Sequence, residues 1–97
     1  MKMIIQDNGD KIIQYDGFQV VLKKPTRELG VNIFCRTPAR KVLWYADVSD
    51  AQYWKKHDQF VGVYPENSES LKATSFTGNE YLITLKTGKV KFLKMVK

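Results

Sequence analysis

Glycine-centred turn signals recur at short intervals along this chain, and they restrict it to short strands joined by tight turns. Asn8-Gly9 and Asp16-Gly17 are the dipeptides that most strongly favour two-residue hairpin loops, because both central positions of such a loop require a positive φ. Gly78 and Gly88 mark two further turns near the C-terminus. Turn signals spaced by about 8–12 residues are typical of antiparallel β architecture, so we expect a chain of hairpins.

The first part of the chain is predicted to form a three-stranded meander. Strands at 2–6, 11–15 and 18–23 have registers that agree across both turns. Ile12 and Ile13 project to opposite faces of the middle strand, and since both are apolar, this strand is expected to be covered on both sides. The expected cross-strand pairs are Ile5 with Ile12, Ile4 with Ile13, Tyr15 with Phe18, Ile13 with Val20 and Ile12 with Val21.

The C-terminal hairpin has a basic tip. Its expected register pairs Lys86 with Lys89 around Thr87-Gly88, and Lys91 lies on the same face. Like charges directly opposite one another destabilise a strand pair, and residues 81–97 contain five lysines and no acidic residue. Nothing local is expected to neutralise these lysines, so the tip favours an anionic partner. The other face of this hairpin is apolar and consists of Tyr81, Ile83, Leu85, Val90 and Phe92.

A second hairpin, with strands at 31–36 and 41–45, also has a basic tip. The expected register places Arg36 opposite Lys41, with Arg40 in the connection between the strands. The sequence therefore predicts two separate basic tips on one small domain.

Aromatic residues lie beside this second basic tip. Trp44 shares a face with Ile33 and is expected in the core, so Tyr45 projects to the other side and is predicted to be exposed. Aromatic rings can stack on nucleic-acid bases while neighbouring cations hold the phosphates. This combination of residue types is consistent with a nucleic-acid-binding surface.

Residues 49–59 are predicted to form a short α-helix. Ser49 followed three residues later by Gln52 fits a capping box, in which the two side chains bond the free amides of the first turn. Lys55 and Lys56 suit the negative C-terminal end of such a helix.

Further strands at 60–64 and 71–76 complete the expected elements. Together they predict a mainly β (α+β) fold with eight or nine short strands and one helix near 49–59. We expect a curled antiparallel sheet or a small partly open barrel built from hairpins. A length of 97 residues fits a single domain, so residues 1–97 are expected to form one small basic β-rich domain.

Few residues of the chain favour catalysis. His57 is the sole histidine and follows two lysines, which is typical of a solvated surface. Cys35 is the sole cysteine and lies in an apolar strand, so we expect a buried structural thiol. Because no His/Cys cluster has metal-ligand spacing, we expect no enzymatic activity, no catalytic residue, no metal and no cofactor.

Cysteine usage and hydrophobicity also bear on location. A lone cysteine cannot form an intramolecular disulfide, which fits a reducing compartment. No stretch approaches the roughly 20 apolar residues of a membrane helix. We therefore expect a cytoplasmic protein with no membrane partner.

The charge balance directs the functional hypothesis. The net charge is +6, and lysines outnumber arginines thirteen to three, which favours contacts with phosphates over bidentate readout of bases. We therefore expect a small non-enzymatic nucleic-acid-binding protein, with RNA or a single strand favoured over a duplex. The residues predicted to contact nucleic acid are Arg36, Arg40, Lys41, Tyr45, Lys86, Lys89 and Lys91.

Two other functions fit the same residues. The small size is typical of phage or mobile-element proteins that bind a host component, so a protein-binding inhibitor or adaptor that docks on an acidic surface is the alternative. A small metal-independent ribonuclease using lysine, arginine and tyrosine is the third. Short strands also leave sheet edges that could support a dimer.

Overall fold

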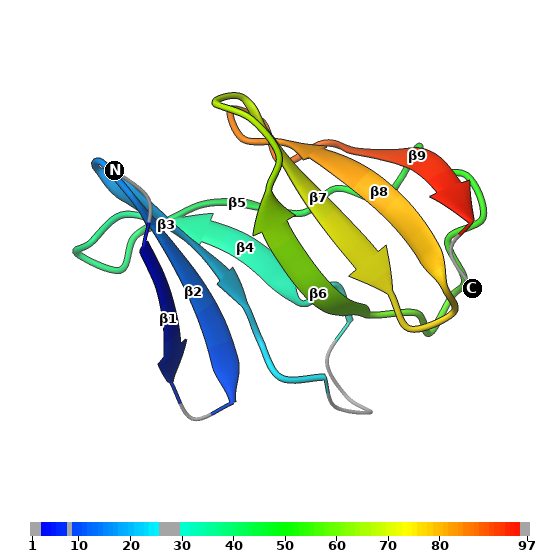
Figure 1. Cartoon of the computed structure of the whole chain (residues 1–97), viewed down its shortest axis with the longest axis horizontal. Helices are drawn as coiled ribbons and strands as arrows, with labels where there is room; N and C mark the ends of the chain where they lie inside the picture. The colour runs from blue at the N-terminus through cyan, green and yellow to red at the C-terminus, as the bar shows by residue number, and fades with distance from the viewer. Residues whose placement is uncertain (1–2, 8, 26–29, 96–97) are drawn as a thin grey trace.

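The computed structural model describes residues 3–7, 9–25 and 30–95, and these residues form nine strands in two antiparallel sheets (Figure 1). The strands are β1 (Met3–Asp7), β2 (Asp10–Tyr15), β3 (Phe18–Leu22), β4 (Ile33–Arg36), β5 (Val42–Tyr45), β6 (Phe60–Pro65), β7 (Ser70–Ser75), β8 (Asn79–Thr84) and β9 (Val90–Met95).

Each sheet follows the order of its strands along the chain. The first sheet has the order β1-β2-β3-β4-β5 and the second has the order β6-β7-β8-β9. Every neighbouring pair within them is antiparallel. The predicted mainly β, hairpin-built architecture is confirmed, but in place of the expected curled sheet or partly open barrel the strands form two separate sheets.

The N-terminal meander has the predicted registers. Ile13 lies between Ile4 and Val20, and Ile12 lies opposite Val21. Both Ile12 and Ile13 are buried, which confirms that β2 is covered on both faces. Two-residue turns fix a hairpin register, and a shift by one residue would exchange the buried and exposed faces.

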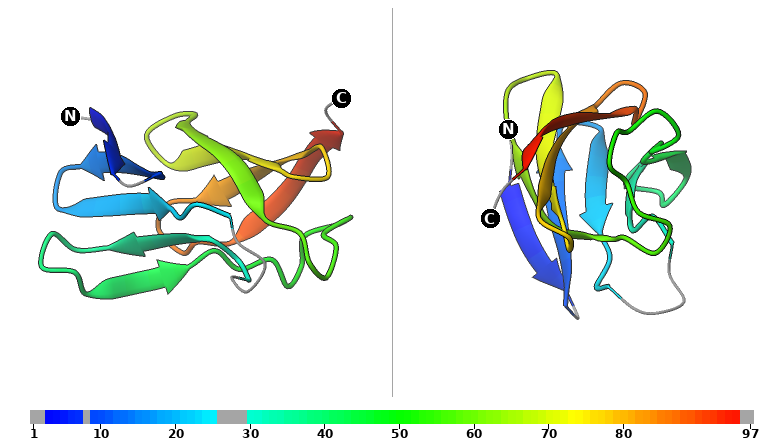
Figure 2. Two further views of the ribbon diagram at one scale, coloured as in Figure 1. Left: turned by 90° about the horizontal axis from the view of Figure 1, so that it is seen from below. Right: turned by 90° about the vertical axis from the view of Figure 1, so that its right-hand side faces the viewer.

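The inner faces of the two sheets pack on one another and form one apolar core (Figure 2). Burial of this apolar surface is the main stabilising term of such a domain. The fully buried side chains of the core include Ile13, Val20 and Ile33 from the first sheet, and Phe60, Leu71, Tyr81 and Ile83 from the second.

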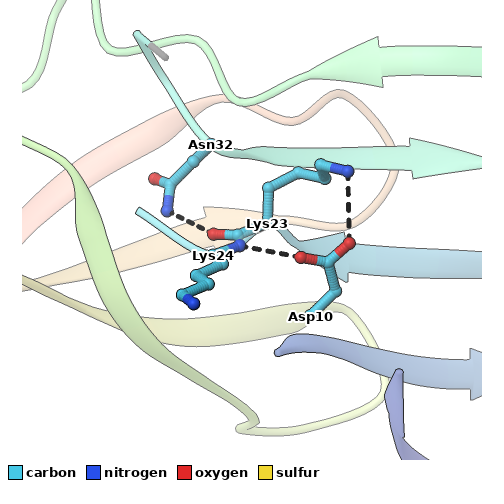
Figure 3. Close-up of polar contacts among 4 residues, drawn as sticks. All are labelled: Asp10, Lys23, Lys24 and Asn32. Carbon is cyan, nitrogen blue, oxygen red and sulfur yellow. Dashed lines mark hydrogen bonds and ion pairs between the residues drawn. The ribbon is translucent and has the colours of Figure 1, made fainter. Parts of the chain in front are cut away.

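A buried asparagine connects the two sheets. The side-chain amide of Asn32 donates to the carbonyl of Phe60 at 2.7 Å, and its Oδ1 accepts from the Phe60 amide at 2.8 Å. The same side-chain amide donates to the carbonyl of Lys23 at 2.9 Å (Figure 3). Asn32 thus satisfies backbone groups at the ends of β3 and β6, where an unpaired buried polar group would be costly.

Asp10 holds the end of β3 against the start of β2 (Figure 3). Its carboxylate accepts from the Lys24 amide at 2.8 Å and pairs with the Lys23 ammonium at 3.2 Å. The hydrogen bond from the Lys24 amide, aided by Lys23, lowers the pKa of Asp10 below its ordinary value. This end of the first sheet therefore has an acidic group beside its lysines.

The predicted helix at 49–59 is wrong, because the described residues contain no helix and this segment forms separate turns. The Ala51 amide donates to the Val48 carbonyl and the Trp54 amide to the Ala51 carbonyl, but these turns do not propagate. The carboxylate of Asp47 caps the first turn by accepting from the Ser49 amide at 3.0 Å. The expected capping box of Ser49 and Gln52 is therefore not the cap of this turn.

Tertiary contacts explain why this segment is not helical. The carbonyls of Gln52 and Tyr53, which a helix would bond internally, accept from Tyr81 Oη at 3.1 Å and from Asn79 Nδ2 at 3.3 Å. Tyr53 has a φ of 65°, which a right-handed helix excludes. Trp54 packs on Phe60, with ring centroids 4.7 Å apart. Contacts with the second sheet thus override the local helix signals.

The β8–β9 register differs from the prediction by two residues. Ile83 pairs with Val90, because the amides of Thr87 and Gly88 both donate to the Thr84 carbonyl and close a longer loop. Lys86 is therefore not a strand partner of Lys89. A shift of two preserves the faces, so the predicted apolar face is confirmed: Tyr81, Ile83, Leu85 and Val90 are buried and Phe92 is partly buried.

The β4–β5 register also differs from the prediction. Arg36 pairs with Val42 and not with Lys41, and a bulge separates Cys35 from Arg36. Lys41 belongs to the turn, where its carbonyl accepts from the Thr37 amide at 2.8 Å. This register places Phe34 opposite Tyr45, and that pair defines the surface described next.

Candidate nucleic-acid interface

Aromatic and basic side chains meet on the β4–β5 hairpin, at the edge of the first sheet. Phe34 and Tyr45 are cross-strand neighbours with ring centroids 5.8 Å apart and an interplanar angle of 45°. Tyr45 is 62% exposed, which confirms the prediction that this side chain projects away from the core. We name the group Phe34, Arg36, Arg40, Lys41 and Tyr45 the β4–β5 surface.

Arg36 is held in place on this surface. Its guanidinium lies over the Phe34 ring, 6.0 Å from the centroid, which is a cation–π arrangement. Its Nε donates to Gln19 Oε1 at 2.8 Å, and Gln19 in turn donates to Gln14 Oε1 at 2.6 Å. Since a guanidinium has five donors, a fixed Nε orients the remaining ones for an anion.

Arg40 and Lys41 project from the turn next to Arg36. The turn is closed by the Arg40 amide, which donates to the Thr37 carbonyl at 2.8 Å, and by the Lys41 amide, which donates to Thr37 Oγ1 at 3.1 Å. Arg40 has a φ of 70°, a strained conformation for a non-glycine residue. Both side chains are exposed.

No ion pair between described residues includes the cations of the β4–β5 surface, although the charge of Arg36 helps the Lys24 amide to lower the pKa of Asp10. The ion pairs there join Lys23 to Asp10, Lys72 to Glu66 and Glu80, and Lys89 to Asp50. None of them includes Arg36, Arg40 or Lys41. Three cations on one hairpin tip repel one another unless an anion from outside binds them.

The β8–β9 tip, residues 84–90, is surrounded differently. Lys89 pairs with Asp50 at 3.0 Å, and this hydrogen-bonded ion pair raises the pKa of Lys89. No residue near Lys89 in the sequence was expected to neutralise it, and its partner Asp50 is indeed distant in the sequence. The Asp47 amide donates to the Gly88 carbonyl at 2.8 Å, and the Val90 amide donates to the Asp47 carbonyl at 3.0 Å.

Trp44 anchors the same tip from the side. Its indole Nε1 donates to the Leu85 carbonyl at 2.8 Å, and its ring covers Gly88, where an added Cβ would lie 2.4 Å from Cε3. The β8–β9 tip is thus packed against β5 and the residues that follow it. Its basic residues lie on a loop that the fold itself fixes.

Lys86 and Lys91 are exposed, but they lie apart from one another. Lys86 lines an open pocket of about 400 Å³ together with Leu43 and Trp44 of β5, so it borders the hairpin that carries the β4–β5 surface. Lys91 pairs with Leu82 on the outer face of the second sheet. The structure thus places Arg36, Arg40, Lys41 and Tyr45 on one hairpin, and Lys86 lines a pocket with two residues of β5.

Phe34 is part of the surface but is absent from the predicted contacts. The expected register places it opposite Leu43. The turn, after which Arg36 pairs with Val42, shifts the register by one residue, and the bulge after Cys35 shifts it by one more, so Phe34 lies opposite Tyr45. Both shifts would have had to be recognised to identify the aromatic pair.

Neither Cys35 nor His57, the two residues considered for catalysis, lies in a setting that favours it. Cys35 is 1% exposed, and burial raises the pKa of its thiol to about 11, which confirms the predicted buried cysteine. His57 is exposed, in a turn and not at a helix end. Over the described ranges, no group of three His, Cys, Asp or Glu side chains is placed to bind a metal, and no helix is long and apolar enough to cross a membrane.

Comparison of the chain with protein-family models, with curated proteins and with solved structures found no match.

Proposed function

We propose that this protein is a non-enzymatic binder of single-stranded nucleic acid, RNA or DNA, and that the β4–β5 surface makes the main contacts. Tyr45 would stack on a base, Phe34 would support that ring, and Arg36 would bind the adjacent phosphate. Arg40 and Lys41 would hold the backbone on either side. Base–aromatic stacking combined with a cationic groove is the usual way to bind a single strand without sequence preference.

One observation carries this proposal. The exposed Tyr45 packs beside the half-buried Phe34, Arg36 lies over Phe34, and no ion pair among the described residues includes the cations of the same tip. The exposed tyrosine ring leaves apolar surface that a partner can cover. Unpaired cations beside it indicate that the partner is anionic.

A single strand fits this surface better than a duplex. The bases of a duplex are stacked inside it, so an aromatic ring on a flat sheet edge has no access to their faces. Sequence-specific readers of duplex DNA commonly insert a recognition helix into the major groove, and the described part of this chain contains no helix.

The remaining predicted contacts take secondary roles in this proposal. Lys86 borders the hairpin and extends its positive field, and Lys91 adds to it from the second sheet. Lys89 is paired with Asp50, so it is expected to contribute less than the other two.

Fluorescence anisotropy with a labelled single-stranded oligonucleotide tests the proposal. Tyr45→Ser should weaken binding about tenfold, because removal of one stacked aromatic costs about 1–3 kcal/mol. Tyr64→Ser is the matched control, because Tyr64 is an exposed tyrosine on the other sheet, 45% accessible. An equal effect of the two substitutions, or no binding by the wild type at low salt, would exclude the β4–β5 surface.

A second function is favoured by the edge of β5. Val42 is 39% exposed and Leu43 is 51% exposed on this edge strand, and exposed apolar edges are sites where another chain can add a strand. An inhibitor or adaptor that binds a protein would use this edge. A stoichiometric protein that remains bound after nuclease treatment of a lysate, and that Val42→Lys with Leu43→Lys releases, would favour this function.

A further inference from the structure

A second cluster of aromatic and basic side chains lies at the other end of the molecule. The β7–β8 turn and the segment 52–59 occupy the end opposite the β4–β5 turn in both Figure 1 and Figure 2. They form an open pocket of about 270 Å³. Its lining residues are Lys55, Lys56, His57, Asp58, Phe76 and Thr77.

Phe76 is the most conspicuous member of this pocket. It is 70% exposed, more than any other large apolar side chain described. The fold uses its backbone, since its amide donates to the Gln59 carbonyl at 2.8 Å. Turns favour glycine because it adopts a positive φ easily, and asparagine and aspartate because their side chains bond the nearby backbone. A phenylalanine side chain offers neither advantage. Packing of the core therefore does not account for this side chain.

Buried polar residues fix the turn that presents Phe76. Asp58 is 4% exposed, and its carboxylate accepts from Thr77 Oγ1 at 2.6 Å and from the Gln59 amide at 2.9 Å. Ser75 is also buried, and its Oγ accepts from the Asn79 amide at 3.1 Å. Hydrogen bonds on both sides of Phe76 thus fix the backbone that carries its ring.

The neighbouring segment is also fixed by hydrogen bonds. The bonds from Asn79 and Tyr81 to the carbonyls of Tyr53 and Gln52 keep Tyr53 at a φ of 65°. In the described residues, the non-glycine residues with positive φ are Tyr53 and Arg40, one beside each aromatic and basic cluster. Strained backbone that the surroundings enforce is concentrated at functional sites.

The charged side chains around the pocket favour an anionic ligand. Lys55, Lys56 and His57 are exposed and supply N–H donors. Asp58 is the acidic member, but it is buried and its two oxygens accept hydrogen bonds from the protein. An anion can therefore approach the lysines without facing an exposed carboxylate. A flat apolar ring beside exposed ammonium groups is complementary to a nucleotide, which presents a base and a phosphate.

We infer that this pocket binds a nucleoside phosphate, with the base stacked on Phe76 and the phosphate held by Lys55 and Lys56. His57 adds a further donor at the rim. The site is separate from the β4–β5 surface and does not depend on the function proposed for it. The ligand is either a free nucleotide or the phosphorylated end of a strand, since both present the same base and phosphate.

Two-dimensional amide NMR with AMP, adenosine and inorganic phosphate as probes tests this inference. AMP should shift the amides of Lys56, Phe76 and Gly78 in a saturable way, and adenosine and phosphate should each bind at least about tenfold more weakly, because each lacks one half of the recognition. No shift of these amides, or equal binding of AMP and phosphate, would overturn the site.

Variants separate this site from the β4–β5 surface. Phe76→Ser should abolish saturable AMP binding without lowering the melting temperature, and Lys55→Gln with Lys56→Gln should weaken it about tenfold. Tyr45→Ser should leave AMP binding unchanged, and a decrease would contradict a separate site.

In the Tyr45→Ser background, a 5′-phosphorylated dinucleotide that binds more tightly than AMP would identify a strand end as the ligand. Tighter binding of AMP would identify the free nucleotide.

Discussion

The two hairpin tips are both basic, but their surroundings are very different. The β8–β9 tip is fixed by Trp44, by the backbone of Asp47 and by an ion pair of Lys89 with Asp50. The β4–β5 tip lies at a sheet edge, and the ion pairs of the described chain leave out its cations. A cluster of like charges in a sequence therefore does not show whether residues distant in the sequence pair with it in the fold.

The chain path explains this difference. After β5 the chain continues alongside the start of β9, where Asp47 and Lys89 form a parallel bridge. This path brings two acidic residues to a tip that lies far from them in the sequence. β5 is the last strand of its sheet, so no strand of the described chain pairs with its outer edge.

The largest expected effect concerns the glycine of the fixed tip. Gly88 has a φ of +79°, and an added Cβ would lie within 3.0 Å of three Trp44 ring atoms. Gly88→Ala should therefore lower the free energy of unfolding by about 2–4 kcal/mol, from backbone strain and overpacking together. Chemical denaturation measures this change.

Gly17 provides the matched control for this substitution. Its φ is +85°, but an added Cβ meets nothing within 4 Å. Gly17→Ala should cost only the strain, about 1 kcal/mol. Equal decreases in stability for the two variants would show that the β8–β9 tip is not packed against Trp44.

A smaller effect is expected at the strained residue of the exposed tip. Asparagine adopts a positive φ more readily than arginine does. The melting temperature of Arg40→Asn should therefore stay the same or rise slightly. Affinity for a single strand should fall about threefold, because the variant can no longer pair with one phosphate. A fall in stability with unchanged affinity would assign Arg40 a structural role.

The smallest effect should come from Asp50→Asn. This change frees Lys89 and removes one negative charge, so affinity for a single strand should rise about twofold at low salt and return to the wild-type value as salt screens the charges. An increase of tenfold or more, measured by the same anisotropy assay, would mean that the β8–β9 tip is a main contact restrained by Asp50.

The sequence predicts the elements of this fold better than it predicts their connections. The N-terminal registers were predictable because two-residue turns at Asn8-Gly9 and Asp16-Gly17 leave one pairing. The tips at 37–41 and 84–89 close through hydrogen bonds to Thr37 and Thr84, and such closure cannot be deduced from residue types. The predicted helix failed because side chains distant in sequence bind its carbonyls.

In the candidate site, too, local features could be predicted from the sequence and long-range contacts could not. The exposure of Tyr45 followed from alternation along one strand, whereas its pairing with Phe34 depends on the register at the turn and on a bulge. The neutralisation of Lys89 depends on Asp50, which no local pattern connects to it. Phe76 falls at the end of a predicted strand, and only the turn that presents it reveals an exposed ring.

The most direct test of the account compares two triple variants that remove the same charge. One carries Arg36→Gln, Arg40→Gln and Lys41→Gln, and the other carries Lys86→Gln, Lys89→Gln and Lys91→Gln. The measurement is the slope of log affinity against log salt for a single-stranded oligonucleotide, which changes by about 0.7 for each phosphate that the protein no longer neutralises. The first variant should flatten the slope by about 2 and the second by less than about 1. Equal flattening, or a larger effect of the second variant, would contradict the account.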